Sequence, residues 1–420
     1  MRVGQAERSQ AVSPTSDPPL PDDGQRVAAG DGGRPKVAVW LLALVSLSGT
    51  VAMHIFVPAM PDAALGLGVG IGQMQLSISL YIAGLAIGQL FYGPISDRFG
   101  RRPTLMAGLV LYTVAGAAAL LSSGIVSLLA ARLVQALGGC AGLVLGRAIV
   151  RDITAAEDTA RKMALMNLMT VIGPGIAPIL GAALAAAFGW RSIFVVLTAL
   201  GLGLLVLAWR KVPETAPLGQ AASGRVVARN YRDLITSPVF LGFAIGGGCA
   251  TTSMYAFVTA APFIFTQQLD RPVGETGFYI ATLVFGVWIG SMIVSRLIGR
   301  MPMATILIGA NLVSVAAAAA LLATVLTGTM TVASTVGLIF VFTLGCGGAS
   351  PMALTQAVSV NPNVAGSASG LYGCAQMVVG AVCSALSGLG SDPALSTAII
   401  LLSAGLMSQG CFWLALRLKR

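Results

Sequence analysis

The sequence GPISDRFGRRP, residues 93–103, forms a very short polar turn between two long apolar segments. Gly100 permits a sharp bend of the backbone, and Asp97 can pair with a neighbouring arginine or face a helix N-terminus, where a negative charge is favoured. Such a pair can close in one conformation and open in another. Positive charges that only anchor membrane helices would explain the arginines, but not the G-x-x-x-D-R-x-G-R-R spacing. The residues expected to form this conformational latch are Gly93, Asp97, Arg98, Gly100, Arg101 and Arg102.

The composition around this turn is that of a membrane protein. Of the 420 residues, 56% are hydrophobic and only 10% are charged, against about 25% charged residues in soluble chains. The apolar runs are rich in Ala, Leu, Gly and Val and do not alternate with polar residues, which favours helices over an outer-membrane barrel. The net charge of +10 is better explained by basic loops on the cytoplasmic side of a membrane than by nucleic-acid binding.

Twelve apolar stretches have about the 20 residues that cross a bilayer. With the N-terminus in the cytoplasm, this count places 22 of the 25 Lys and Arg residues on the cytoplasmic side. Both termini are therefore expected to be cytoplasmic. The predicted spans are 37–57, 75–95, 104–122, 125–150, 163–187, 192–210, 239–265, 275–296, 303–326, 331–356, 365–388 and 395–416.

The charge and composition also divide the chain. A weak echo of the 93–103 turn, Ser295-Arg296-Leu-Ile-Gly299-Arg300, follows the eighth span, as expected for a duplicated transporter. The predicted parts are a disordered cytoplasmic tail (1–36), a six-helix bundle (37–210), a cytoplasmic linker (211–238), a second six-helix bundle (239–416) and a short cytoplasmic tail (417–420).

The 93–103 turn resembles the signature that members of the major facilitator superfamily carry between their second and third helices. The resemblance covers about residues 37–420. It implies the major facilitator fold, an all-α integral membrane protein of two pseudo-symmetric six-helix bundles that rock about a central substrate site.

Arg132 lies within the fourth predicted span, where an arginine costs roughly 2.5–3.5 kcal/mol. It should face a cavity or a partner, or else reach the membrane surface with its long side chain. Together with Gln135 it resembles the R-x-x-Q-G pattern of proton-coupled members, although Ala136 and Leu137 displace the expected glycine.

The fifth span contains Ala177-Pro178-Ile-Leu-Gly181-Ala182, which resembles the G-P-x-x-G-G motif of antiporters. The resemblance implies export by exchange; an ordinary proline kink with close helix packing is the alternative. Shorter matches resemble the group related to bicyclomycin and chloramphenicol exporters, namely Val57-Pro58-Ala-Met-Pro61, Gly146-Arg147-Ala-Ile-Val-Arg151-Asp152, Gly189-Trp190-Arg191, Val212-Pro213-Glu214-Thr215, Ala261-Pro262-Phe263 and Ala365-Gly366-Ser-Ala-Ser369.

His54, the single histidine of the chain, occupies the position where relatives in that group often carry an aspartate. No Asp or Glu lies deep in any predicted span, and a histidine pKa near 6.5 suits a switch at neutral pH. We hypothesise that His54 carries the coupled proton and that Arg132 tunes it by like-charge repulsion. The alternative is a polar residue that contacts water or substrate without coupling.

Polar and aromatic residues on helices that line such cavities are candidates for substrate binding, with simple interhelical hydrogen bonds as the alternative for each. A mostly apolar cavity with few charges favours neutral lipophilic compounds over dications. The candidates are Ser46, Thr50, Tyr81, Gln135, Asn167, Thr251, Tyr255, Gln356 and Gln376.

The predicted function is export of lipophilic small molecules or drugs in exchange for protons across a bacterial inner membrane. Export of a native metabolite, such as a sugar or amino acid derivative, and facilitated diffusion without protons are the alternatives. The sequence has neither the paired carboxylates at membrane depth that an intramembrane enzyme would need nor the phosphate-binding loop of a primary pump. The six cysteines lie in apolar stretches without a CxxC pair, so no metal or other cofactor is expected. The expected partners are the substrate, protons and the bilayer, with no nucleic acid, and the protein is expected to be a monomer.

Overall fold

Long helices make up most of the protein. The computed structural model describes residues 37–154, 156–216 and 224–419, without several side chains of residues 156–172. The predicted tail 1–36 lies outside these residues. The first half contains α1 (Val39–His54), η2 (Val57–Ala59), α2 (Met60–Leu67), α3 (Ile71–Phe99), α4 (Arg101–Leu120), α5 (Ile125–Ile153), α6 (Ala156–Phe188) and α7 (Arg191–Lys211). The rest contains α8 (Gly224–Ile235), α9 (Pro238–Thr251), α10 (Met254–Phe263), η3 (Ile264–Gln268), α11 (Val273–Leu297), α12 (Met303–Leu326), α13 (Val332–Val358), η4 (Pro362–Val364), α14 (Ala365–Ser387) and α15 (Pro393–Leu418).

The number of membrane spans agrees with the sequence. Within the described residues, 11 segments are long and apolar enough to cross a membrane, where α1 to α2 and α9 to η3 each form one segment. The twelfth is α6, a helix of 33 residues whose described apolar segment is Gly173–Phe188. No strand occurs in the described ranges. The prediction of an all-α membrane protein with twelve spans is therefore confirmed.

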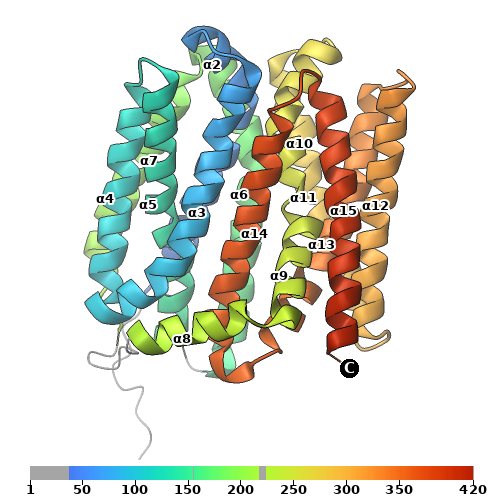
Figure 1. Cartoon of the computed structure of the whole chain (residues 1–420). Coiled ribbons are helices and arrows are strands. Elements are labelled where there is room, and N and C mark those ends of the chain that lie inside the picture. Colours follow the sequence, from blue (N-terminus) through green and yellow to red (C-terminus); the bar gives the residue numbers. More distant parts are fainter. Residues whose placement is uncertain (1–36, 155, 217–223, 420) are drawn as a thin grey trace, which may run out of the picture. The chain divides into compact units, whose positions relative to one another are not determined.

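The helices form two six-helix bundles, α1–α7 and α9–α15, which meet along two pairs of helices (Figure 1). One pair is α3 with α14 and the other is α6 with α11. Glycines allow the close approach. A Cβ on Gly72 would collide with the Gly388 carbonyl, and a Cβ on Gly277 would lie 2.6 Å from the Pro178 carbonyl oxygen.

The first span of each bundle is broken near its middle, which the sequence analysis did not predict. In the first span α1 ends at His54 and the chain resumes as η2, with Pro58 lacking an amide donor. In the seventh span α9 ends at Thr251 and α10 starts at Met254. There the hydroxyls of Thr251 and Thr252 bond to carbonyls one turn back, at 2.6 and 2.8 Å, and so compete with the helical amides.

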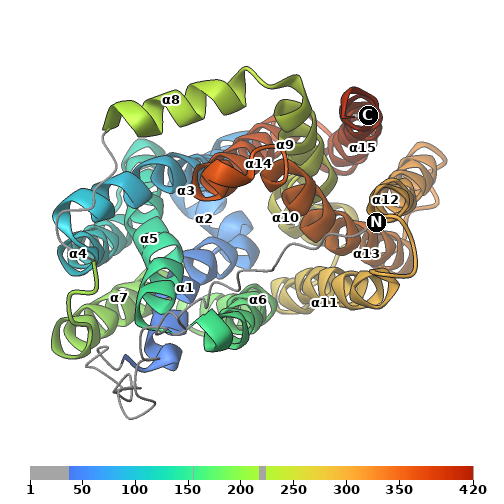
Figure 2. The ribbon, with the colours of Figure 1, turned by 90° about the horizontal axis from the view of Figure 1, so that it is seen from below.

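The predicted linker contains a helix, α8, that the sequence analysis missed. Val227, Tyr231 and Leu234 share one face of α8 and are wholly or partly buried. The Tyr231 hydroxyl donates to the Leu90 carbonyl of α3 at 3.3 Å. Seen from the α8 side (Figure 2), α8 runs along the edge of both bundles, and α15 ends on this same side (Figure 1).

Candidate functional site

The two broken spans meet at the boundary between the bundles. The His54 ring, at the end of α1, lies 6.2 Å from the Tyr255 ring at the start of α10, with the ring planes at 54°. Both side chains are nearly buried, with 5% and 8% of their surface exposed. Irregular backbone at membrane depth is tolerated where it is buried in protein or lines a cavity, and discontinuous helices form the substrate and ion sites of many transporters.

The hydrogen bond of the His54 ring defines its tautomer. Nδ1 lies 2.8 Å from the Thr50 carbonyl oxygen. Since a carbonyl can only accept, Nδ1 carries the hydrogen and Nε2 is left as the proton acceptor of the neutral ring. The arrangement holds the ring in place while one nitrogen stays available for protonation.

On the other side of the break in the seventh span, α14 is tied to α9 by two predicted site residues. Gln376 Nε2 donates to Thr251 Oγ1 at 2.7 Å. The Thr252 hydroxyl in turn donates to the Gln376 carbonyl at 2.6 Å. Gly380 packs one turn further along α14, where a Cβ would lie 2.9 Å from the Tyr255 ring. Thr251, Tyr255 and Gln376 therefore form one group beside His54.

Arg132 lies fully inside the first bundle, with 0% of its surface exposed. Its Nη1 donates to the Ala52 carbonyl at 2.9 Å and to Gln135 Oε1 at 2.8 Å. The Ala52 carbonyl is close to the break in the first span. Nε and Nη2 of Arg132, and Nε2 of Gln135, have no partner among the described residues. A buried cation with two unused donor atoms is costly, which points to a functional role.

Aromatic rings take the place of a counter-charge around Arg132. Its guanidinium carbon lies 4.2 Å from the centre of the Tyr81 ring, 5.4 Å from Phe56 and 5.9 Å from Phe194. The Tyr81 hydroxyl donates to the Gly49 carbonyl at 2.7 Å, which directs the ring face toward Arg132. Such cation–π contacts stabilise a desolvated cation by about 2 kcal/mol.

Four predicted substrate candidates have side chains that bond elsewhere or are outside the described side chains. The Ser46 hydroxyl donates to the Gly142 carbonyl at 3.0 Å and joins α1 to α5. The Thr50 hydroxyl bonds within its own helix, to Leu47 at 3.0 Å. Gln356 is at the α8 end of the molecule, where its Oε1 accepts from Lys419 at 2.6 Å. The Asn167 side chain is outside the described part of the structure.

The predicted antiporter stretch on α6 contacts the broken region of the first span and α11 of the second bundle. A Cβ on Gly181 would collide with the Ile55 carbonyl, directly after the end of α1. Ala177, with 1% of its surface exposed, is buried in the same core. The Pro178 carbonyl faces Gly277 of α11 across the boundary between the bundles. Close packing of α6 thus supports the site from the side opposite to α3.

A network of neutral hydrogen bonds joins the bundles at the α2 end, and the sequence analysis missed it. Gln75 Nε2 donates to the Thr259 carbonyl at 3.3 Å, and Ser387 Oγ donates to Gln75 Oε1 at 3.5 Å. The Ser79 and Ser384 hydroxyls lie 2.8 Å apart. These five side chains are buried. Polar residues one turn apart at the ends of two spans were the available signal, but nothing in the sequence paired α3 with α14.

The residues of the predicted latch form a charged cluster within the first bundle. Arg101 forms ion pairs with Asp97 at 2.5 Å and with Asp152 at 3.1 Å. The Glu214 carboxylate accepts the backbone amides of Arg101 and Arg102 at 2.8 and 3.2 Å. These amides are unpaired donors of the first turn of α4, so Glu214 caps that helix from a distant part of the chain.

Of the three further residues of the predicted latch, Gly100 and Arg98 make a described contact and Gly93 does not. Gly100 has a φ of 98°, and a Cβ there would lie 2.5 Å from Glu214 Oε2. Arg98 lies over the Phe99 ring at 5.3 Å, and a Cβ on Gly93 would meet nothing within 4 Å. The described side chains that bond to the paired Asp97 and Arg101 side chains, Ser96 and Asp152, belong to the first bundle.

The surroundings of Glu214 lower its pKa. Partial burial raises the pKa, but hydrogen bonds from the amides of Ala216, Arg101, Thr215 and Arg102 outweigh it and hold the pKa below its ordinary value. The Val212-Pro213-Glu214-Thr215 stretch, noted in the sequence only as a resemblance, therefore has a physical role in ending one loop and starting α4.

Three relatives resemble the chain in sequence. An uncharacterized MFS-type transporter YdgK of Bacillus subtilis is 30% identical over 393 residues, 91% of this chain and 96% of its own length. A bicyclomycin resistance protein homolog of Haemophilus influenzae is 26% identical over 83% of this chain and 88% of its own. A chloramphenicol resistance protein of Pseudomonas aeruginosa is 31% identical over 62% of this chain and 61% of its own.

Solved structures share the fold at low sequence identity. The D-xylose-proton symporter matches with a TM-score of 0.71 and 14% identity, over 88% of this chain and 96% of its own. A bacterial homolog of the human lysosomal transporter Spinster, in an inward-facing and unoccupied conformation, also has a TM-score of 0.71 with 14% identity, over 90% of this chain and 96% of its own. The family model described as Major Facilitator Superfamily matches residues 41–384. The chain therefore belongs to the Major Facilitator Superfamily, and the predicted resemblance to its bicyclomycin and chloramphenicol resistance proteins is confirmed.

Proposed function

We propose that this transporter exports neutral lipophilic small molecules in exchange for protons, and that His54 carries the proton. The observation on which the proposal rests is the meeting of His54 and Tyr255 at the breaks of the first and seventh spans. A helix broken there can move its two halves separately. The ring therefore lies where a change between inward-facing and outward-facing states would alter its surroundings.

The nature of the substrate is inferred from the side chains near the break. Phe56, Trp190 and Phe194 form a buried aromatic cluster with ring centres 5.1 to 6.4 Å apart. No Asp or Glu is buried among the described residues, so a cationic substrate would find no carboxylate there. Relatives named as bicyclomycin and chloramphenicol resistance proteins support drug-like substrates.

Arg132 is proposed to respond to the charge of His54. It bonds to the Ala52 carbonyl, two residues before His54, and has unused donor atoms. Like-charge repulsion from Arg132 is proposed to disfavour a positive charge on the His54 ring and so to promote proton release. Pro178 and Gly181 would support this step by holding α6 against the broken part of the first span.

A transport assay in liposomes with a trapped pH dye tests this proposal. An outward gradient of each antibiotic or dye in a panel is imposed on wild type, His54→Asn and Ser48→Ala. Ser48 is a matched control, since it is buried in the same helix and its hydroxyl bonds only within that helix, at 2.8 Å. Substrate-dependent proton movement is expected in wild type and Ser48→Ala, and is expected to vanish in His54→Asn.

Other outcomes separate the alternatives. Proton movement that persists in His54→Asn would show that the protein is an antiporter but that His54 does not carry the proton. Substrate flux without proton movement in wild type would indicate a facilitator and refute coupling. Flux of a sugar or amino acid derivative alone, with none of the lipophilic compounds, would indicate export of a native metabolite.

The orientation proposed from the basic residues places both termini in the cytoplasm of a bacterial cell, with α8 on the cytoplasmic side. A reporter enzyme that is active only outside the inner membrane, fused after the end of α15, should be inactive. Activity of that fusion would reverse the orientation. We also propose that the two bundles comprise residues 37–210 and 239–416 and that the protein is a monomer.

A further inference from the structure

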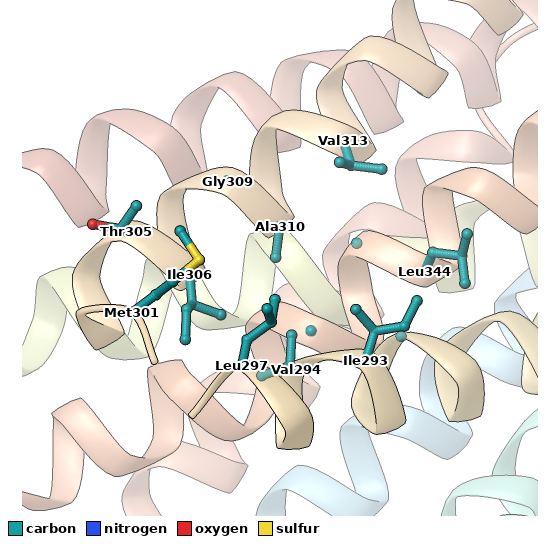
Figure 3. Close-up of a pocket in the computed structure, with 13 residues that line it drawn as sticks. Ile293, Val294, Leu297, Met301, Thr305, Ile306, Gly309, Ala310, Val313 and Leu344 are labelled. Carbon is teal, nitrogen blue, oxygen red and sulfur yellow. The ribbon is translucent and has the colours of Figure 1, made fainter. Parts of the chain in front are cut away.

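An apolar groove lies between α11 and α12 in the second bundle, with α13 as its floor. Its volume is about 320 Å³. Val294 and Leu297 of α11 face Ile306 and Ala310 of α12, and Thr305 contributes the single polar side chain of the lining (Figure 3). Ile293 at its rim is exposed. A groove of this kind can hold a hydrocarbon chain but offers almost nothing to a polar molecule.

A second, more polar cavity lies on the other side of α12, against the end of α15. Its volume is about 790 Å³, and Trp413, Arg417 and Lys419 line it. The guanidinium of Arg417 lies 3.4 Å from the centre of the Trp413 ring. Nζ of Lys419 donates to Gln356 Oε1 at 2.6 Å and to Ser359 Oγ at 2.9 Å, which fixes the ammonium group beside the cavity.

The two cavities adjoin at α12. Thr305 and Gly309 line both of them. A Cβ on Gly309 would meet nothing within 4 Å, so the surface of the helix is low at this point. One molecule can therefore occupy the apolar groove and the polar cavity together by crossing α12 at Gly309.

The charge at this end of the second bundle is positive. Arg296, Arg300, Arg417 and Lys419 are exposed, and none of them forms an ion pair with a described residue. Tryptophan favours the level of the lipid headgroups, and basic pockets between membrane helices bind anionic headgroups. The expected ligand thus combines an anionic head with a long apolar chain.

We propose that this surface binds one anionic phospholipid of the leaflet on the α8 side, with its headgroup against Arg417 and Lys419 and an acyl chain in the groove between α11 and α12. Charge complementarity and the two cavities that adjoin at Gly309 are the basis for this choice. The site is separate from His54 and does not depend on the proposed transport reaction.

Native mass spectrometry of the purified full chain in mild detergent tests the proposal, with phosphatidylglycerol and phosphatidylcholine of identical acyl chains. Wild type should bind phosphatidylglycerol more tightly. Each of Arg417→Gln and Lys419→Gln should weaken the binding of phosphatidylglycerol by about fivefold without changing the affinity for phosphatidylcholine. Gly309→Leu should weaken the binding of both lipids, because the leucine side chain blocks the path over α12. Lys211→Gln and Gly203→Leu, matched changes at exposed positions of α7, should leave both affinities unchanged.

Several results would overturn the proposal. Equal affinity for the two lipids would show that Arg417 and Lys419 do not bind the headgroup. Unchanged affinity for phosphatidylglycerol when both residues are replaced would show the same. Displacement of phosphatidylglycerol by millimolar inorganic phosphate would indicate an anion site with no role for the groove. If Gly309→Leu does not fold, the two charge variants still decide the question, since both residues are exposed at the end of α15.

Discussion

Gln75→Asn is expected to shift the transporter away from the conformation in which the α2 end is closed. Gln75 makes two hydrogen bonds between the bundles, to the Thr259 carbonyl at 3.3 Å and from Ser387 at 3.5 Å. Asparagine is one methylene shorter, so both bonds are lost while the side chain stays polar. At about 0.6 kcal/mol for each bond in a membrane protein, the change is about 1.2 kcal/mol. The closed population should fall by about sevenfold relative to the open one.

Distance measurements between spin labels can detect this shift. Leu65 on α2 and Leu389 after α14 are exposed by 83% and 80%, and they belong to different bundles. Double electron–electron resonance between cysteines introduced there should show a larger long-distance fraction in Gln75→Asn. Gln73→Asn is the control, because Gln73 is exposed on the same turn of α3. An unchanged distribution in Gln75→Asn, or the same shift in Gln73→Asn, would refute the reasoning.

Three further predictions concern the close contacts. Gly100→Ala should lower the thermal unfolding midpoint, because its positive φ of 98° costs an L-residue about 1–3 kcal/mol, whereas Gly93→Ala, within α3, should not lower it. Glu214→Gln should lower the unfolding midpoint at pH 7 by weakening the cap of α4. Because the pKa of Glu214 is depressed in the folded state, the difference in midpoint from wild type should be complete above the ordinary pKa of 4.5. It should be lost as the pH falls through the pKa of Glu214 in the folded protein. Gly181→Ala should reduce transport because its Cβ collides with the broken part of the first span, while Gly175→Ala, with its nearest neighbour at 3.5 Å, should transport normally. The three expectations would be contradicted, respectively, by an unchanged midpoint in Gly100→Ala, by a midpoint difference in Glu214→Gln that does not depend on pH, and by normal transport in Gly181→Ala.

The spans could be predicted from the sequence because the membrane imposes a length and an apolar composition on each helix. The breaks at His54 and Thr251 were not predicted, although part of their cause is local: Pro58 lacks an amide donor, and the hydroxyls of Thr251 and Thr252 bond one turn back in their own helix. The side chains around Arg132 show a different limit. Tyr81, Phe56 and Phe194 come from three segments, and no local pattern joins them. Only the single pair of Arg132 and Gln135, three residues apart on one helix, was visible in advance.

The helix α8 and the Glu214 cap escaped prediction for a different reason. Only three residues of α8, Val227, Tyr231 and Leu234, form its apolar face, and the polar remainder has the composition of a linker. Glu214 reaches amides more than a hundred positions earlier in the chain, at Arg101 and Arg102. Both features are stabilised by parts of the chain that are remote in sequence.

The two ends of the transporter use different chemistry. At the α2 end the described bonds between the bundles involve neutral groups such as Gln75 and Ser79, whose strength does not change with pH. The Asp97–Arg101 pair and the Asp152 carboxylate that joins it lie within one bundle. Neither arrangement gives protons a direct way to open or close the α2 end. If transport is driven by protons, the response must therefore start at the centre, where His54 is the single histidine. The spin-label distance between Leu65 and Leu389 should then depend on pH in wild type and lose that dependence in His54→Asn, and a dependence that survives the substitution would place the proton elsewhere.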